Sequence, residues 1–560
     1  MIPVQRERIA EYTARGWWGT RRIQDWLADA VRTRPDALAL VDAPNRAGFI
    51  DGPVRRLTWA GLDTEVLRYA TLLLDLGLGK GDIVCTQLPN CVELAVLYLA
   101  CLRLGIVVTP APVQYREHEL EHILGLARPK AIVTAERILH HRHADMMRTL
   151  AAHHPSIGAV HPIDRSASPG IDTERVLRHE REHSVHANDL FTICWTSGTE
   201  GVPKGVPRSH NEWLAIPENI ILSGGLQPGC NLLNAFPLVN MAGIAGQFLP
   251  WLLTGAKLAL HHPFCLQVFL DQIRDEDIDY TVAAPAILAT LAQNPDLMRG
   301  IGGSRLRAIG SGGGPLAEWT VKAFTERYGI DVINYFGTNE GASLTASALD
   351  LPDPARRACY FPRFGVEGFE WKLPVAKRVA TRLVDPESGL DIDSPGRPGE
   401  LRARGPAIFS EYFRAPEMTA RAFDEQGYYR TGDLFEIAGE RNELYRFVGR
   451  LKDIIVRGGF NISSEEIETL LLAHPKVREA AIVGYPDETL GERVCAVVAL
   501  QPGTALELAE LVAFLRQEKK VASFKLPEKL LLLDALPRNP VGKVLKRDLR
   551  SLVAASTAAV

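Results

Sequence analysis

The chain has 560 residues and a formal net charge of −4, with 46% hydrophobic and 23% charged residues. One hydrophobic core rarely organises more than about 250–300 residues, so this length predicts several subdomains. The near-neutral charge provides no field strong enough to gather nucleic acid or an anionic membrane, and we expect neither as a partner.

The cysteines and the N-terminus favour a cytoplasmic protein. The eight cysteines form no CxxC pair, and a chain of this size needs no disulfide framework, which favours reduced thiols. The N-terminal residues lack the apolar core of a secretion signal. The most apolar stretch, residues 94–110, carries Arg103 and leaves too short a charge-free run to cross a bilayer.

The N-terminal part alternates between amphipathic helices and short apolar strands. We expect helices at 22–31, 62–76, 92–104 and 120–126, and strands at 38–41, 83–88, 106–109 and 131–133. Such alternation is typical of α/β layers around largely parallel sheets. Residues 161–186 are rich in turn formers and predict a surface connection.

The remaining elements predict further subdomains. A second helix–strand series runs from residue 189 to about 333. Strands at 400–404 and 444–448 predict a small barrel or a third subdomain, and the residues after Gly449 predict a compact α+β unit. The histidines at 140, 141 and 143 are mixed with arginines, so we expect a solvated helix face rather than a metal site.

The first segment that indicates chemistry follows an apolar strand at 190–194 and reads WTSGTEGVPKG over residues 195–205. Glycines and small hydroxyl residues allow N–H and O–H groups to surround an anion, and Lys204 adds positive charge. Phosphate binding is therefore predicted, with an ordinary glycine-rich turn as the alternative. The spacing of a Walker loop is absent.

Three further segments each allow a functional and a structural interpretation. In YRTGDL at 429–434, Asp433 could accept hydrogen bonds from a ribose diol or cap a turn. The run GRLKDII at 449–455, followed by RGGFNI and an acidic helix start, predicts a linker into a new domain or a surface hairpin. Near the end, the segment LPRNPVGKVL at 536–545 places Lys543 beside a glycine. Lys543 could be a reactive group or merely a solvated charge.

In this order and spacing, the four segments resemble the adenylate-forming superfamily of acyl-CoA synthetases, adenylation domains and luciferases. The resemblance covers essentially the whole chain, with further matches at 236–239 (FPLV), 312–316 (GGGPL), 335–341 (YFGTNEG) and 524–528 (FKLPE). The start, Arg15-Gly16-Trp17-Trp18, looks like members that act on aryl and alicyclic acids.

The resemblance implies an α/β fold with two domains. Residues 1–448 would form a large N-terminal domain of layered α/β subdomains plus a small barrel-like subdomain, which binds ATP and the acid. Residues 449–452 would form a hinge, and residues 453–560 a small mobile α+β domain. The implied reaction joins a carboxylate and ATP into an acyl-adenylate and pyrophosphate, followed by transfer of the acyl group to CoA.

The resemblance also implies nucleotide-binding and catalytic residues. The phosphates would be held by Thr196, Ser197, Gly198, Thr199 and Lys204, and adenine by Gly312, Gly313, Gly314 and Pro315 with Tyr335, Phe336, Gly337 and Thr338. Asp433 would bind the ribose and Arg450 would support the nucleotide. Glu340 would bind Mg²⁺, Lys452 would be the hinge residue, and Lys543 would bridge the acid carboxylate and the α-phosphate as the principal catalytic residue.

Two more sets concern the acid and the acceptor. The acid would be bound by Asn240, Met241, Ala242, Gly243, Gly246, Gly312 and Gly337, and the many small residues here predict a bulky apolar or cyclic acid rather than acetate. CoA would be bound by Arg457, Gly458, Gly459, Phe460 and Lys525. Because the same segments occur in members that load carrier proteins, an acyl-carrier protein stays open as the acceptor.

Three positions depart from the family pattern. Asn240 stands where many acyl-CoA synthetases have a histidine, Asn339 replaces the threonine before the metal-binding glutamate, and Glu200 replaces a hydroxyl residue in the phosphate segment. Adenylation alone, luciferase-type oxygenation and a pseudoenzyme that binds ATP or an acyl ligand therefore stay open as alternatives. The sequence also leaves open whether the chain forms a homodimer.

Overall fold

The computed structural model describes residues 4–163, 170–196, 203–301, 303–457, 460–487, 489–519, 521–539 and 543–558. Its contacts divide the chain into two compact units. Unit 1 comprises Met1–Arg357, Glu367–Ala380 and Ala403–Tyr429. Unit 2 comprises Ala358–Val366, Thr381–Arg402 and Arg430–Val560.

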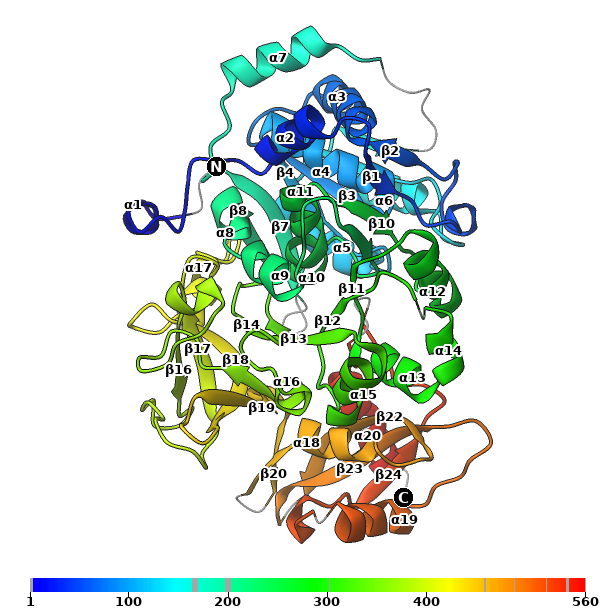
Figure 1. The fold of residues 1–560 in the computed structure, drawn as a ribbon, viewed down its shortest axis with the longest axis vertical. Helices are drawn as coiled ribbons and strands as arrows, with labels where there is room; N and C mark the ends of the chain where they lie inside the picture. Colours follow the sequence, from blue (N-terminus) through cyan, green and yellow to red (C-terminus); the bar gives the residue numbers. More distant parts are fainter. Residues whose placement is uncertain are drawn as a thin grey trace. The chain divides into compact units, whose positions relative to one another are not determined.

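Unit 1 contains two mainly parallel sheets (Figure 1). The first has the strand order β6-β5-β3-β4-β7-β8 and is parallel except for the β7–β8 pair. Its strands are β3 (Ile83–Gln87), β4 (Val107–Pro110), β5 (Ala131–Thr134), β6 (Ala159–Pro162), β7 (Leu190–Thr196) and β8 (Lys204–Ser209). The predicted strands at 83–88, 106–109 and 131–133 are thus confirmed to within two residues.

The second sheet has the order β14-β13-β12-β11-β9-β10-β1-β2 and is antiparallel only at its two edge pairs, β13–β14 and β1–β2. Its strands are β1 (Leu38–Val41), β2 (Arg56–Thr58), β9 (Asn231–Asn234), β10 (Lys257–Leu260), β11 (Tyr280–Val282), β12 (Ala308–Gly312), β13 (Asp331–Gly337) and β14 (Ser343–Ala346).

Helices cover these sheets because each carries an apolar face. Helix α4 (Val92–Leu104) is buried along almost its whole length and belongs to the main core cluster, which fits a sequence that is apolar except for Glu93, Tyr98 and Arg103. It ends at Gly105, whose φ of 71° favours glycine at this helix terminus. The other helices are α1 (Arg6–Ala14), α2 (Asp25–Thr33), α3 (Trp59–Asp75), α5 (Glu117–Ala127), α6 (His143–Ala151), α8 (His210–Leu214), α9 (Pro217–Ser223), α10 (Met241–Gly243), α11 (Leu249–Thr254), α12 (Leu266–Asp275), α13 (Pro285–Gln293), α14 (Pro295–Arg299), α15 (Glu318–Tyr328), α16 (Pro354–Cys359) and α17 (Pro416–Ala422), with short turns of other pitch at Arg46–Gly48, Ile244–Phe248 and Pro374–Lys377.

The segment expected to be a plain surface connection contains a helix, α7 (Thr173–Glu182), which is set apart at the top of Figure 1. Asp172 caps it by accepting a hydrogen bond from Arg175 N. Val176 is buried in the main core cluster, and Glu180 pairs with Arg103 of α4. The described residues of 161–186 are mostly exposed or half-buried, as predicted for a surface connection, but the helix within them was not predicted.

Unit 2 contains the remaining sheets. One has the order β15-β19-β18-β17-β16, with β15 (Tyr360–Pro362), β16 (Ala380–Val384), β17 (Gly399–Arg404), β18 (Tyr429–Ala438) and β19 (Leu444–Arg450). The other has the order β21-β20-β23-β22, and β24 pairs with β23. Its strands are β20 (Ile454–Arg457), β21 (Phe460–Ser463), β22 (Val477–Asp487), β23 (Gly491–Leu500) and β24 (Lys529–Leu532), and its helices are α18 (Ser464–Leu471), α19 (Leu508–Ala513) and α20 (Lys546–Ala558), with short turns at Leu451–Asp453, Phe514–Glu518 and Ser523–Lys525.

The contacts group residues 358–366 and 381–402 with the C-terminal part, whereas the predicted domain boundary lies at 449–452. The predicted hinge concerns how the C-terminal domain moves, which these contacts do not test. It therefore stays a prediction. Within unit 2, both α18 and α20 contact β22 (Figure 1). Among the described helices, none combines the length and the apolar character needed to cross a membrane.

Candidate active site

Strands β7 and β8 flank the predicted phosphate segment. Thr196 at the end of β7 pairs with Lys204 at the start of β8. Lys204 Nζ lies 5.2 Å from the centre of the Tyr412 ring, a cation–π distance. The hairpin thus brings together the two described ends of the loop. The predicted residues Ser197, Gly198 and Thr199, together with Glu200, lie outside the described residues.

The predicted adenine site is at the carboxyl ends of β12 and β13, where residues 312–315 and 336–338 follow neighbouring parallel strands. Open α/β sheets bind ligands at such ends. Gly312 pairs with Tyr335, and a Cβ at Gly312 would lie 2.5 Å from Tyr335 O. Gly313 has a φ of 82°. Both positions therefore need glycine for reasons of backbone geometry.

Tyr335 and Phe336 point to opposite faces of β13, as successive strand residues do. Tyr335 Oη lies 2.9 Å from Ser223 Oγ and accepts a hydrogen bond from Tyr280 Oη at 3.4 Å. Burial raises the pKa of Tyr335 to about 12. Phe336 packs against a cluster that includes Val206. The hydroxyl of Tyr335 is thus committed to contacts within the protein.

Glu340, the predicted Mg²⁺ ligand, lies in a buried loop after β13. Its Oε1 accepts a hydrogen bond from Tyr412 Oη at 2.9 Å, and its backbone O accepts one from Phe409 N at 2.8 Å. Gly341 has a φ of 102°, and a Cβ there would lie 1.8 Å from Ala407 O. The loop is therefore packed tightly against residues 405–412, which hold the carboxylate in one place.

Arg208 is a residue of this site that the sequence analysis missed. It is fully buried on β8, and its guanidinium donates to Asn339 O from Nε at 3.0 Å and from Nη2 at 2.9 Å. Nη1 donates to Ala407 O at 2.9 Å. Arg208 thereby ties the Glu340 loop to the opposing segment. An arginine among the apolar residues of strand 204–209 was the available signal.

On the predicted acid side, Asn240 is the N-cap of α10. Its Oδ1 accepts a hydrogen bond from Gly243 N at 3.2 Å. Met241 N, two residues earlier, bonds instead to Oδ1 of Asn339 at 2.8 Å. The two asparagines that depart from the family pattern therefore each bind one N–H group in the first turn of the same helix.

The small residues of this segment do not all leave space. A Cβ at Gly243 would lie 2.1 Å from Pro237 O, so this glycine permits close packing of two backbones. Ala245 is buried in the main core cluster and Ala242 is exposed. At Gly246 no atom lies within 4 Å of an added Cβ, so this position alone among the four offers open volume. It lies in a π-helical turn, a feature frequent at functional sites.

In unit 2, Asp433 and Arg450 are direct partners on β18 and β19. Asp433 is buried, and its Oδ1 lies 3.2 Å from Arg450 Nε. The predicted ribose ligand and the predicted nucleotide-supporting cation are therefore one ion pair. A carboxylate has several lone-pair sites, so one that pairs with Arg450 can also accept hydrogen bonds from a diol.

Lys543 belongs to the same charged group. The surrounding protein lowers the pKa of Lys543 to about 8, mainly by burial and then by the charge of Arg450, while Asp433 and Glu465 oppose the shift. The residue keeps an exposed surface, so water offsets part of this effect. Burial also raises the pKa of the nearby Glu465 to about 6. Unit 2 thus gathers Asp433, Arg450 and Lys543, which lie far apart in the sequence.

The predicted hinge segment has many contacts. Arg550 of α20 donates to Lys452 O at 3.3 Å and to Asp453 Oδ1 at 3.0 Å. Ser464 Oγ donates to Asp453 O at 3.0 Å. Burial lowers the pKa of Lys452, and Asp453 opposes the shift. The start of α18 and the helix α20 therefore fix this segment in the present arrangement.

The predicted CoA residues are engaged within unit 2. Arg457 pairs with Glu528 at 2.8 Å, and Lys525 Nζ donates to both oxygens of Glu466 at 2.7 and 2.8 Å. Gly458 and Gly459 lie outside the described residues, and Phe460 begins β21. Binding of CoA phosphates by Arg457 or Lys525 would compete with these ion pairs.

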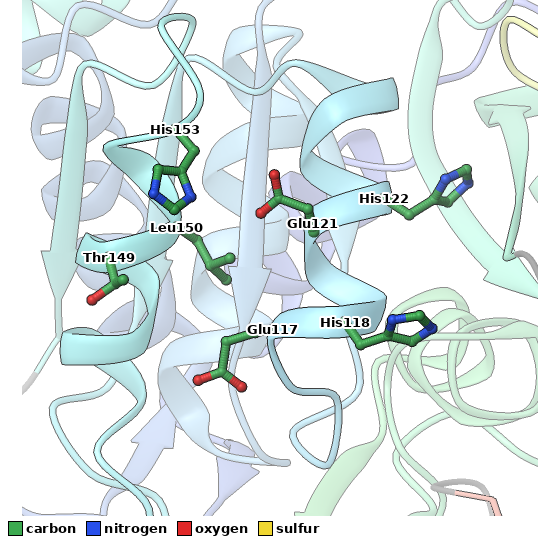
Figure 2. Close-up of a pocket in the computed structure, with 7 residues that line it drawn as sticks. All are labelled: Glu117, His118, Glu121, His122, Thr149, Leu150 and His153. Atoms are coloured by element: carbon green, nitrogen blue, oxygen red, sulfur yellow. The ribbon is translucent and has the colours of Figure 1, made fainter.

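A surface pocket of about 530 Å³ lies between α5 and α6, and none of the predicted site residues is among those that line it (Figure 2). It is lined by Glu117, His118, Glu121, His122, Thr149, Leu150 and His153. Figure 2 shows the rings of His118 and His122 on one side of α5 and the two carboxylates on the other. Within the described parts of the chain, no three His, Cys, Asp or Glu residues gather as metal ligands would.

His143 corrects one expectation. It is buried rather than solvated, with Nε2 2.9 Å from Val113 O and Nδ1 3.1 Å from His141 O. Burial lowers the pKa of His143, and the contacts with the two carbonyl oxygens oppose the shift. All eight cysteines are free thiols, as predicted.

Comparison with known proteins identifies the family. The family model named AMP-binding enzyme matches residues 27–413. The family model named AMP-binding enzyme C-terminal domain matches residues 466–543. The chain is 32% identical to the medium-chain fatty-acid–CoA ligase of Escherichia coli (strain K12), over 97% of this chain and 92% of that protein. It is 30% identical to the salicyl-AMP ligase / salicyl-S-ArCP synthetase of Mycobacterium tuberculosis (strain ATCC 25618 / H37Rv), over 98% of this chain and 93% of that protein. The crystal structure of ATP-bound MatB from Rhodopseudomonas palustris matches with a TM-score of 0.77 and 27% identity, over 95% of this chain and 99% of that chain. The chain therefore belongs to the AMP-binding enzymes of the adenylate-forming superfamily, which activate carboxylic acids with ATP.

Proposed function

We propose that this enzyme activates a bulky apolar or cyclic carboxylic acid as its acyl-adenylate and then transfers the acyl group to CoA, with Lys543 as the principal catalytic residue. ATP and CoA are the substrates that the family implies. The observation that carries the assignment of roles is the charged group of unit 2, in which the ammonium of Lys543 shares one environment with Asp433 and Arg450.

In the first step, a carboxylate oxygen of the acid attacks the α-phosphorus of ATP. The new O–P bond forms as the bond between the α-phosphorus and the bridging oxygen breaks, and pyrophosphate leaves. Two anions meet and charge grows on the phosphoryl oxygens, so a cation at that point stabilises the transition state more than the ground state. Lys543 supplies this charge, and Asp433 holds the ribose so that the α-phosphate faces the acid.

In the second step, the CoA thiol loses its proton to solvent and its sulfur attacks the acyl carbonyl. A thioester bond forms, the acyl–phosphate bond breaks and AMP leaves. Lys452 and the segment at 449–452 are proposed as the hinge between the two steps. This proposal predicts that the contact of Arg550 with Lys452 O changes when the domain turns, whereas its contact with Asp453, in the same domain, is kept.

Mg²⁺ is proposed to bind Glu340 together with phosphate oxygens of ATP, and to neutralise their charge. Magnesium is usually held by one or two carboxylates plus phosphates and water, so a single buried carboxylate fits this use. Tyr412 occupies Oε1 and would leave Oε2 for the ion. Thr196 and Lys204, with Ser197, Gly198 and Thr199, are proposed to bind the phosphates.

The acid is proposed to lie beside α10 and the π-turn, with Gly246 and the ends of β12 and β13 around it. The open volume at Gly246 supports a large substrate. The two relatives named above, which act on fatty acids and on salicylate by their names, are consistent with an apolar or aryl acid.

Other outcomes stay open as alternatives. The name of the mycobacterial relative supports a carrier-protein thiol as an alternative acceptor. The ion pairs of Arg457 and Lys525 favour neither acceptor. Eight free thiols support a cytoplasmic location. The presence of Lys543, Asp433 and Glu340 argues against a pseudoenzyme.

One assay tests the function. Purified protein, ATP and Mg²⁺ are combined with octanoate, benzoate, salicylate, 1-naphthoate or acetate, and pyrophosphate release is measured with and without CoA. We expect release with large acids, a thioester only when CoA is added, and little activity with acetate. Adenylate without thioester would favour a carrier protein, and silence with every acid would favour the pseudoenzyme.

A further inference from the structure

Asn339 connects two parts of the site that the sequence treats separately. Its backbone belongs to the Glu340 loop, where its carbonyl accepts two hydrogen bonds from Arg208 at 2.9 and 3.0 Å. Its side-chain Oδ1 accepts a hydrogen bond from Met241 N at 2.8 Å, at the start of α10. One residue therefore joins the proposed Mg²⁺ side to the proposed acid side.

The Glu340 loop cannot absorb a shift of Asn339 locally. Arg208 is fully buried and also donates to Ala407 O, while Gly341 approaches Ala407 so closely that a Cβ would overlap. Glu340 itself is bonded to Tyr412 and to the backbone of residue 409. Tightly packed segments with few alternatives move together rather than deform gradually.

The start of α10, beside the proposed acid site, is also held by hydrogen bonds. Met241 N is one of the first N–H groups of α10, which have no partner within the helix. Asn240 satisfies Gly243 N, and only Asn339 reaches Met241 N among the described contacts of that group. Helix α10 continues directly into the π-turn that contains Gly246. A shift of the π-turn on acid binding would therefore pull on Asn339.

We propose that Asn339 is a positioning residue that couples binding of the acid to binding of Mg²⁺–ATP. When the acid orders α10, the Met241–Asn339 bond fixes the Glu340 loop in the geometry that receives the metal and the phosphates. The coupling is reciprocal, because each ligand must change the affinity of the other by the same factor. This inference rests on the proposed function, since it needs both ligands to bind.

The test measures how much the acid tightens binding of an ATP analogue, expressed as the ratio of the dissociation constants without and with the acid. The dissociation constant of α,β-methylene-ATP with Mg²⁺ is determined with and without saturating octanoate, benzoate or 1-naphthoate. We expect the acid to tighten binding of the analogue by about 5-fold or more in the wild-type protein, the lower range of measured couplings. In Asn339→Ala the ratio should fall to about 1, because the Oδ1 acceptor is lost.

Two further variants distinguish a loss of coupling from a general weakening of ligand binding. Asn240→Ala removes the other cap of α10 but leaves Asn339 in place, so acid affinity should weaken while the ratio is kept. Asn339→Asp keeps an acceptor oxygen for Met241 N, so it should retain most of the ratio although its charge weakens binding of the analogue in both conditions. Binding of the analogue by each variant also shows that it is folded.

The outcomes distinguish the two proposals. A wild-type ratio of 1 with normal binding of the analogue overturns the coupling and leaves the proposed function intact. An unchanged ratio in Asn339→Ala, or an equal loss in Asn240→Ala, also overturns the coupling. Wild-type protein that does not bind the analogue at all would overturn the proposed function, and the coupling with it.

Discussion

The Glu340 loop and the Lys543 segment carry the two groups proposed to act on the phosphates, and they are held in opposite ways. Glu340 is buried and fixed by Arg208, Tyr412 and a glycine that admits no side chain. Lys543 keeps an exposed surface; its backbone N donates to Asn539 Oδ1 at 2.8 Å and its backbone O accepts from Asn539 N at 2.7 Å. A preorganised carboxylate suits a group that receives the metal, whereas an ammonium with an exposed surface suits the proposed role of a group that acts in only one of the two steps.

Among the variants considered, Lys543→Ala should have the largest effect. We expect acid-dependent pyrophosphate exchange to fall on the order of 10²–10³, because a charge aimed at the transition state is lost. Binding of α,β-methylene-ATP should be nearly unchanged. Lys519→Ala, which removes the same charge elsewhere in unit 2, is the matched control. Near-normal exchange in Lys543→Ala would remove this residue from the mechanism.

Gly341→Ala tests how much the close packing of the Glu340 loop stabilises the protein. Strain at a φ of 102° adds to the overlap with Ala407 O, so we expect a loss of about 3 kcal/mol or more in the free energy of unfolding. Gly427→Ala is the control: its φ is 77° and its Cβ would meet no atom within 4 Å, so about 1–2 kcal/mol should be lost. Equal losses in urea denaturation of the two variants would show that the close packing contributes nothing.

Asp433→Ala tests the proposed binding of the ribose by Asp433. Loss of hydrogen bonds to a charged group should weaken ATP binding by roughly 1.5–3 kcal/mol, measured by titration calorimetry. Asp433→Asn keeps an acceptor oxygen and removes the ion pair with Arg450, so it should cost less. An ATP affinity unchanged in both variants contradicts the ribose role.

The pH dependence of pyrophosphate exchange should report the protonation of Lys543. Since the pKa of Lys543 is lowered to about 8, it loses its proton as pH rises through that value, and pyrophosphate exchange should decline there. Lys543→Arg should abolish the decline, because guanidinium stays charged. Glu465→Gln removes a carboxylate that raises the pKa of Lys543, so the decline should move to lower pH. A flat wild-type profile between pH 7 and 9.5 would contradict this role of the charge.

The family and much of the fold were predictable because they depend on local patterns. The apolar runs at 38–41 and 83–88 form β1 and β3, and the apolar segment 92–104 forms α4, since periodicity and end signals act within a few residues. The motif segments identified the superfamily for the same reason: glycines, charges and prolines at fixed spacing set a loop's chemistry. Helix α7 escaped because its stability depends on charged contacts with distant helices.

By itself, the sequence determined which residue types stand where, and so the superfamily, the α/β layers and the identity of Glu340, Asp433 and Lys543 as candidates. Only the tertiary structure decided that Asn339 bonds Met241, that Arg208 fixes the Glu340 loop and that His143 is buried. These contacts join residues that lie about 30 to 200 positions apart in the chain. Such pairs leave no periodic signal in the chain, because packing and loop closure bring them together only in the folded state.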